Sequence, residues 1–134
     1  MLQIDKMDES EEYTKDKIYI KTKGTCLSIN SGRLSFPDDI LIFSKLTVLD
    51  LSNNCFMYLP AELGNLTQLK SLNLNGNCLV EFPVFSFAYL FILSLAGNPF
   101  MGAVDTTNMP VLATLYLSYH VTACTLKSTA VIRC

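Results

Sequence analysis

Short stretches of alternating apolar and polar residues recur along this chain. Residues 49–51 and 72–74 each consist of a leucine, a polar residue and a second leucine, and an asparagine stands three positions after the second leucine. A period of two sends the leucines to one face of a strand and the residues between them to the other. The pattern therefore predicts a series of short strands, each ending at a turn that contains the asparagine.

The same framework returns after twenty-three residues, so the sequence contains an internal repeat. The recurring positions are Leu46, Leu49, Leu51, Asn54 and Phe56 in one copy and Leu69, Leu72, Leu74, Asn77 and Leu79 in the next. Leu59-Pro60 likewise returns as Phe82-Pro83. A single unit of this kind cannot bury its apolar face alone, and we therefore expect the units to stack on one another.

We predict about five units over residues 24–120, with boundaries at 24–45, 46–68, 69–89, 90–111 and a degenerate 112–120. In the first unit Leu34 takes the place of Phe56, and Phe36-Pro37 comes one residue early. Residues 1–23 are rich in charge of both signs and are predicted to be an N-terminal cap, with a polar helix over 8–16 and a strand around Ile18 and Ile20. A disordered acidic tail is the alternative. Residues 121–134 are expected to be an irregular C-terminal cap or the end of a truncated or alternatively spliced chain.

Residues 46–66, LTVLDLSNNCFMYLPAELGNL, resemble the leucine-rich repeat of about 22–24 residues. Their second half, LPAELGNL, resembles the intracellular, Ras-suppressor-like subgroup of that family. The resemblance implies an α/β fold class: a right-handed solenoid in the form of a short horseshoe, with a parallel concave sheet and a helical or irregular convex side. It also implies protein–protein recognition through the concave strands and no enzymatic activity.

The candidate partner-binding residues of the concave face are residues that alternate with the leucines, together with Phe91 and Tyr119 beside them. They are Val48, Asp50, Ser52, Ser71, Asn73, Asn75, Phe91, Ile92, Ser94, Thr114, Tyr116 and Tyr119. They are small and nearly uncharged in the first units and become apolar and aromatic in the later ones. Because exposed aromatic side chains often dominate interface energetics, the predicted centre comprises Phe91, Ile92, Tyr116 and Tyr119. The alternative is that these four pack beneath the C-terminal tail.

Two further sets of repeated residues favour structural roles. Asn54, Asn77 and Asn98 are predicted to form a ladder that bonds buried backbone groups at the turns. Cys55 and Cys78 occupy the same position in adjacent units, and we favour thiols packed as small apolar groups over a disulfide.

The chemistry of the sequence argues against several classes of function. A net charge of −2 and the lack of a Lys/Arg cluster argue against nucleic-acid binding. A single histidine, no Gly-rich phosphate loop and no nucleophile-elbow motif argue against an enzyme, a metal site or a cofactor. Residues 82–104 carry no charge, but they follow the repeat, so a membrane span is not expected.

We therefore expect a non-catalytic adaptor, scaffold or regulatory subunit of signalling, with a protein partner such as a small GTPase or a phosphatase subunit. Five cysteines without a CxxC pair, and a start without a secretory signal, favour the cytoplasm. One alternative is a substrate-recognition fragment of a larger enzyme or ubiquitin-ligase complex. Another is a membrane-associated or secreted repeat receptor, in which Asn65 would be a glycosylation site.

Overall fold

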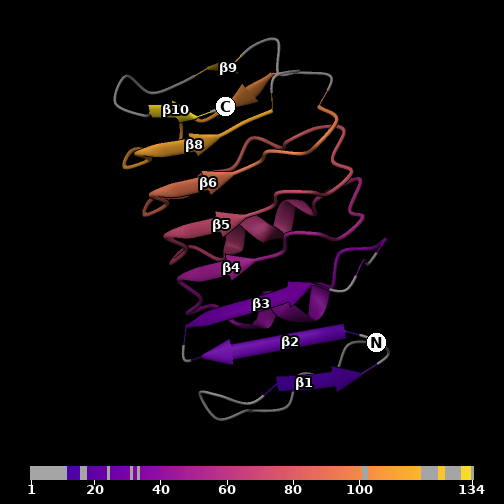
Figure 1. Ribbon diagram of the computed structural model, residues 1–134. Helices are drawn as coiled ribbons and strands as arrows, with labels where there is room; N and C mark the ends of the chain where they lie inside the picture. Colours follow the sequence, from indigo (N-terminus) through magenta and orange to yellow (C-terminus); the bar gives the residue numbers. More distant parts are fainter. Residues whose placement is uncertain are drawn as a thin grey trace.

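The computed structural model describes residues 12–15, 18–23, 25–30, 32, 34–100, 103–118, 124–125 and 131–133. Eight strands form one stacked sheet in the order β1-β2-β3-β4-β5-β6-β8-β10 (Figure 1). Their bounds are β1 Glu12–Lys15, β2 Ile18–Lys23, β3 Cys26–Asn30, β4 Val48–Asp50, β5 Ser71–Asn73, β6 Ile92–Ser94, β8 Thr114–Tyr116 and β10 Val131–Arg133. Strands β7 (Val104–Asp105) and β9 (Cys124–Thr125) pair separately, in parallel.

The strands β3, β4, β5, β6 and β8 are parallel neighbours, and one leucine of each lies opposite the next. These Cα partners are Leu27, Leu49, Leu72, Leu93 and Leu115, here called the leucine row. All five side chains are at most 2% exposed. The predicted stack with inward leucines in register is therefore present in the structure.

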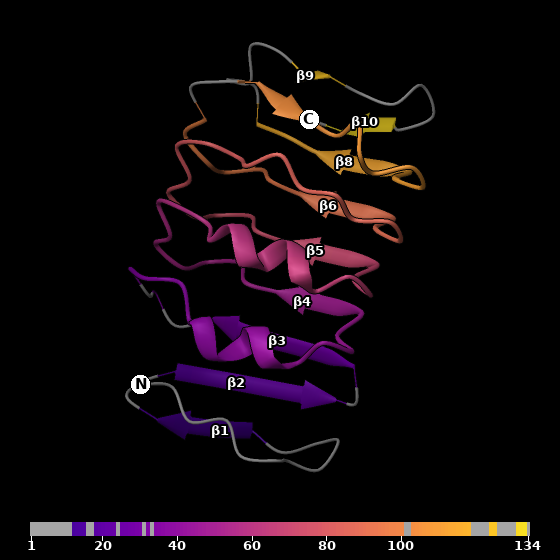
Figure 2. The ribbon, with the colours of Figure 1, turned by 180° about the vertical axis from the view of Figure 1, so that it is seen from behind.

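The return half of the first two complete units is a 3-10 helix. Helices η1 (Asp38–Ile42) and η2 (Ala61–Asn65) each follow a proline. In Figure 2 both helices lie nearer to the viewer than the sheet. Buried Ile40 and Leu63 anchor the helices to the core. The convex side was expected to be helical or irregular, and at these two returns it is helical.

The return half of the third unit, which the structure describes throughout, contains no helix, and three phenylalanines fill the core there. Phe82, Phe85 and Phe87 are buried, and consecutive ring centroids lie 5.3 and 5.2 Å apart. Aromatic rings at this spacing gain from tilted or edge-on contact in addition to burial. This cluster is part of the hydrophobic core.

The N-terminal segment departs from the prediction in one respect. Strand β1 pairs antiparallel with β2, and β2 pairs antiparallel with β3. The predicted helix over 8–16 is therefore wrong for Glu12–Lys15, and its residues 8–11 and 16 lie outside the described part of the chain. Backbone pairing across the open edge of β3 satisfies groups that an isolated polar helix would leave exposed, and this long-range gain outweighs local helix preference.

The C-terminal segment, expected to be irregular, contains two short strands. Strand β10 extends the main sheet by pairing in parallel with β8, and β9 pairs with β7. The prediction is wrong at these positions. For β10 the reason is that the backbone groups on the outer edge of β8 can pair with any segment that returns alongside β8, with or without the leucine pattern.

The first unit also differs from its alignment with the second. The alignment of the first two units predicts that Leu34 takes the inward place of Phe56, but Leu34 is 81% exposed. Phe36 is partly buried, and its ring centroid lies 5.7 Å from that of Phe56. The early Phe-Pro pair thus brings an aromatic ring into the core where Leu34 does not reach it.

The uncharged stretch 82–104 contains strand β6 and turns of the repeat. None of the helices in the described residues has the length and apolar character needed to cross a membrane.

Candidate partner-binding surface

Eight predicted binding residues come together on the outer face of the parallel sheet. They form two lines across β4, β5, β6 and β8, with consecutive members as Cα partners; we call them the outer strip. One line is Val48, Ser71, Ile92 and Thr114, and the other is Asp50, Asn73, Ser94 and Tyr116. Because the leucine row alternates with them in every strand, these side chains point away from the core.

The N-terminal half of the strip is occupied by its own hydrogen bonds. Asp50 Oδ1 accepts from the Ser52 amide at 3.0 Å and from Ser52 Oγ at 2.6 Å. Asn73 Oδ1 accepts from the Asn75 amide at 3.0 Å, and Asn75 Oδ1 accepts from the Ala96 amide at 2.8 Å. These four predicted binding residues therefore hold the turns at the strand ends, which the alternation pattern could not indicate.

The C-terminal half of the strip presents apolar and aromatic surface. Phe91, immediately before β6, is 54% exposed and Tyr116 is 39% exposed, while Ile92 is half-buried. Ser94, the Cα partner of Tyr116, is buried at 8% exposure. Phe91 and Tyr116 are thus accessible to solvent, and Tyr119 lies outside the described residues.

The asparagine at the end of each strand links neighbouring units. The Asn77 amide nitrogen donates to Leu74 O at 3.0 Å in its own unit and to Leu51 O at 2.9 Å in the preceding one. Asn77 Oδ1 accepts from the Phe56 amide at 3.2 Å. All of these groups are buried, so the side chain satisfies backbone atoms that water cannot reach.

Asn54 and Asn98 repeat this arrangement. Their amide nitrogens donate within 3.0 Å to Leu51 O and Ile29 O for Asn54, and to Leu95 O and Leu74 O for Asn98. Each asparagine is at most 5% exposed, which leaves none of the three available as a partner-binding row.

The repeated cysteines are more accessible than the sequence indicated. Cys55 and Cys78 are both free thiols; Cys55 is half-buried and Cys78 is exposed. The expectation of buried, packed thiols is therefore wrong for Cys78. Its position follows the buried Asn77, and the turn there directs alternate side chains to the surface.

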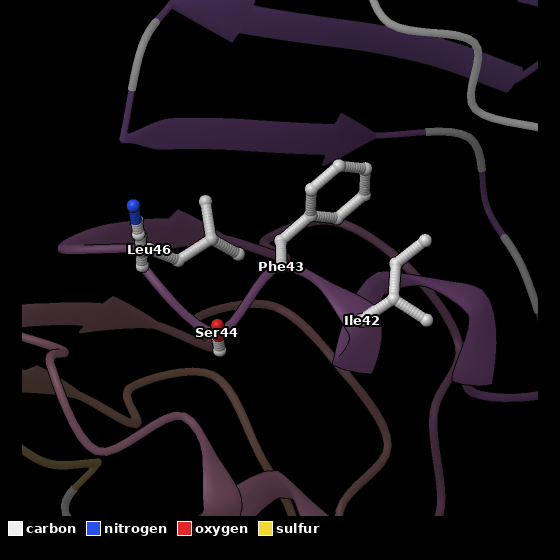
Figure 3. Close-up of a pocket in the computed structure, with 5 residues that line it drawn as sticks. Ile42, Phe43, Ser44 and Leu46 are labelled. Atoms are coloured by element: carbon white, nitrogen blue, oxygen red, sulfur yellow. The ribbon is translucent and has the colours of Figure 1, made fainter.

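An open hollow lies at the end of η1, lined by Ile42, Phe43, Ser44, Lys45 and Leu46 (Figure 3). Its lining contains no carboxylate or imidazole, so it lacks an acid–base pair. Among the described residues no group of three or more His, Cys, Asp or Glu side chains is arranged to hold a metal ion.

A stack of parallel strands, with inward leucines in register and an asparagine ladder between coils, defines a repeat protein of the solenoid class. A family model described as "Leucine Rich repeats (2 copies)" matches residues 44–86. Residues 44–86 therefore carry leucine-rich repeats. Such repeats generally serve as protein-interaction modules.

A segment of 45 residues is 53% identical to "Leucine-rich repeat protein 1" of Mus musculus. The match covers 34% of this chain but only 11% of the length of that relative. No solved structure matches the chain.

Proposed function

We propose that this chain is a non-catalytic interaction module that holds a protein partner against the outer strip and Phe91, with the main contacts at Phe91, Ile92 and Tyr116. The observation that carries the proposal is the change in character along the strip. Its first half is polar and bonded to its own turns, whereas its second half exposes the ring of Tyr116, and Phe91, immediately before β6, exposes a second ring.

Aromatic side chains on an otherwise small, weakly charged surface suit an apolar protein epitope. Asp50 is the only ionisable acid of the strip, and its Oδ1 is already bonded to Ser52. A partner therefore gains affinity mainly by burying apolar area on the rings, with hydrogen bonds at the rim. No side chain of this surface supports a catalytic role, and we propose that the chain is not an enzyme.

The repeat LPAELGNL supports an assignment to the intracellular, Ras-suppressor-like subgroup. We accordingly propose a cytoplasmic protein whose sheet is the concave wall of a short right-handed horseshoe. Partners compatible with that subgroup are a small GTPase or a phosphatase subunit. The cysteine content without a CxxC pair is consistent with this reducing compartment.

The test compares capture by the natural chain with capture by the triple variant Phe91→Ala, Ile92→Ala and Tyr116→Ala. Proteins retained by the natural chain from a cytoplasmic extract are identified, purified and titrated directly against both chains. Loss of central aromatic contacts should weaken binding by about thirtyfold or more.

The matched control substitutes two other exposed apolar residues, Leu34→Ala and Ile42→Ala, which are 81% and 73% exposed and lie outside the strip. This control should bind like the natural chain. Thermal melting of all three chains must agree within a few degrees, so that lost binding reports the surface rather than the fold. Equal affinity of the triple variant and the control would reject the proposed surface.

A further inference from the structure

Two free cysteines occupy equivalent positions in neighbouring coils of the stack. Cys55 follows Asn54 beyond the turn after β4, and Cys78 follows Asn77 beyond the turn after β5. The coils that contain β4 and β5 lie side by side in both views (Figures 1 and 2). Neither the family match nor the proposed partner surface gives these thiols a role.

Backbone hydrogen bonds hold the two coils in register on both sides of the cysteines. Before them, the Asn53 amide donates to Asn75 O at 2.9 Å. At Cys78 itself, the backbone amide donates to the carbonyl oxygen of Phe56, the residue after Cys55, at 2.9 Å. The Phe56 amide in turn donates to Asn77 Oδ1. Strands of one sheet lie about 4.8 Å apart, and a disulfide joins Cα atoms about 4.4–6.8 Å apart. The coil spacing therefore suits a cross-link between Cys55 and Cys78.

The two thiols differ in access to solvent. Cys78 is exposed and Cys55 is half-buried. Access determines which thiol meets a dissolved oxidant first. Cys78 is thus placed to react with a small molecule, and Cys55 is placed to react next with the sulfur of Cys78.

We propose that Cys55 and Cys78 form a reversible thiol–disulfide site that is oxidised by low-molecular-weight disulfides. The Cys78 thiolate attacks one sulfur of the oxidant, whose S–S bond breaks and releases one half as a thiolate, leaving the other half on Cys78. The Cys55 thiolate then attacks the Cys78 sulfur and expels the second half. The protein loses two electrons and two protons, and the oxidant is reduced to two thiols. Excess small thiol reverses both exchanges.

Oxidation joins one coil to the next immediately beyond the turns that end β4 and β5. The closed loop spans residues 55–78, one full repeat, and restricts the unfolded chain more than the folded one. The site would therefore stiffen the centre of the stack under oxidising conditions and release it when reduced thiols return. Transient disulfides of this kind are the form expected in a reducing compartment.

The experiment treats the full chain carrying Cys26→Ser, Cys124→Ser and Cys134→Ser with oxidised glutathione. Mass spectrometry should find the loss of two hydrogens and one linked peptide pair that contains Cys55 and Cys78. The melting temperature should rise by about 5 °C or more, and dithiothreitol should abolish the rise. Peptide mapping of the unsubstituted chain should show the same link as the main one, so the test does not depend on the background substitutions.

The matched control adds Cys55→Ser to the same background. It should stop at a glutathione adduct on Cys78, with no rise in melting temperature. The reciprocal control, Cys78→Ser, should react at least about tenfold more slowly because Cys55 is half-buried. Glutathione on both cysteines without an internal link, or a link that lowers the melting temperature, would overturn the proposal.

Discussion

At the scale of single residues, Asn77 makes three buried hydrogen bonds, two of which connect its coil to the preceding one. We predict that Asn77→Ala lowers the free energy of unfolding by about 1–3 kcal/mol, because Leu51 O and the Phe56 amide lose a partner that water cannot replace. Urea unfolding followed by circular dichroism measures the change. Asn65→Ala, at an exposed position of η2, is the control and should shift the free energy by less than about 0.5 kcal/mol. Equal effects at both positions would mean that the ladder contributes nothing specific.

Asp105 provides a pH-dependent test at the same scale. The Thr107 amide at 2.9 Å and the Thr107 hydroxyl at 2.8 Å donate to Asp105 Oδ1, and they hold the pKa of this carboxyl below its ordinary value of 3.8. A pKa that is lower in the folded state stabilises the protein at pH values above the unfolded pKa, and this contribution disappears as the pH falls through the folded pKa. Asp105→Asn removes the contribution. The natural chain should therefore melt at a higher temperature than the variant at pH 6, with the difference shrinking below about pH 4. A difference that stays constant from pH 7 to pH 3 would contradict this assignment.

The residues of the site show what a sequence pattern can and cannot predict. Alternation fixes the direction of a side chain, so the outward position of Val48, Asp50 and Tyr116 was predictable. Alternation carries no information about what an outward side chain then bonds. The Asp50 bond to Ser52 depends on the turn geometry after β4, and the exposure of Cys78 depends on the turn after β5.

At the scale of elements, one turn position repeats in a left-handed conformation. Asn53, Gly76 and Gly97 have φ values of 58°, 66° and 70° and precede the ladder asparagines. A Cβ on Gly97 would lie 3.1 Å from Gly76 N and 3.3 Å from Gly76 Cα. The turns of neighbouring units therefore approach so closely that the backbone itself forms the contact.

We predict that Gly97→Ala lowers the free energy of unfolding by about 1–3 kcal/mol, since a left-handed alanine costs about 1–2 kcal/mol before any crowding is counted. Denaturant unfolding measures the loss. The matched substitution Asn53→Gly keeps the left-handed turn and should change the free energy by less than about 0.5 kcal/mol. Tolerance of alanine at Gly97 with an unchanged midpoint would show that the turn relaxes away from its neighbour.

The elements themselves differ in how far they could be predicted. Strands β4, β5, β6 and β8 carry alternating leucines, and the alternation reports burial directly. Strands β1 and β10 belong to the sheet because they pair with an open edge, and edge pairing uses backbone groups that every sequence possesses. A local helix preference over residues 8–16 was therefore a poor guide to Glu12–Lys15.

At the scale of the whole molecule, each coil contacts only its neighbours, so the stack depends on how its ends are closed. The hairpin of β1 and β2 closes the N-terminal end by pairing along β3, beside buried Leu27 and Ile29. We predict that deletion of residues 1–23 lowers the melting temperature and promotes association, because it exposes the backbone edge of β3 and the apolar residues behind it. Size-exclusion chromatography with light scattering, together with thermal melting, tests both effects. Deletion of residues 1–11 alone retains β1 and β2 and should leave the association state and the melting temperature of the full chain unchanged. If the longer deletion also leaves both unchanged, the hairpin is not the cap that stabilises this end of the stack.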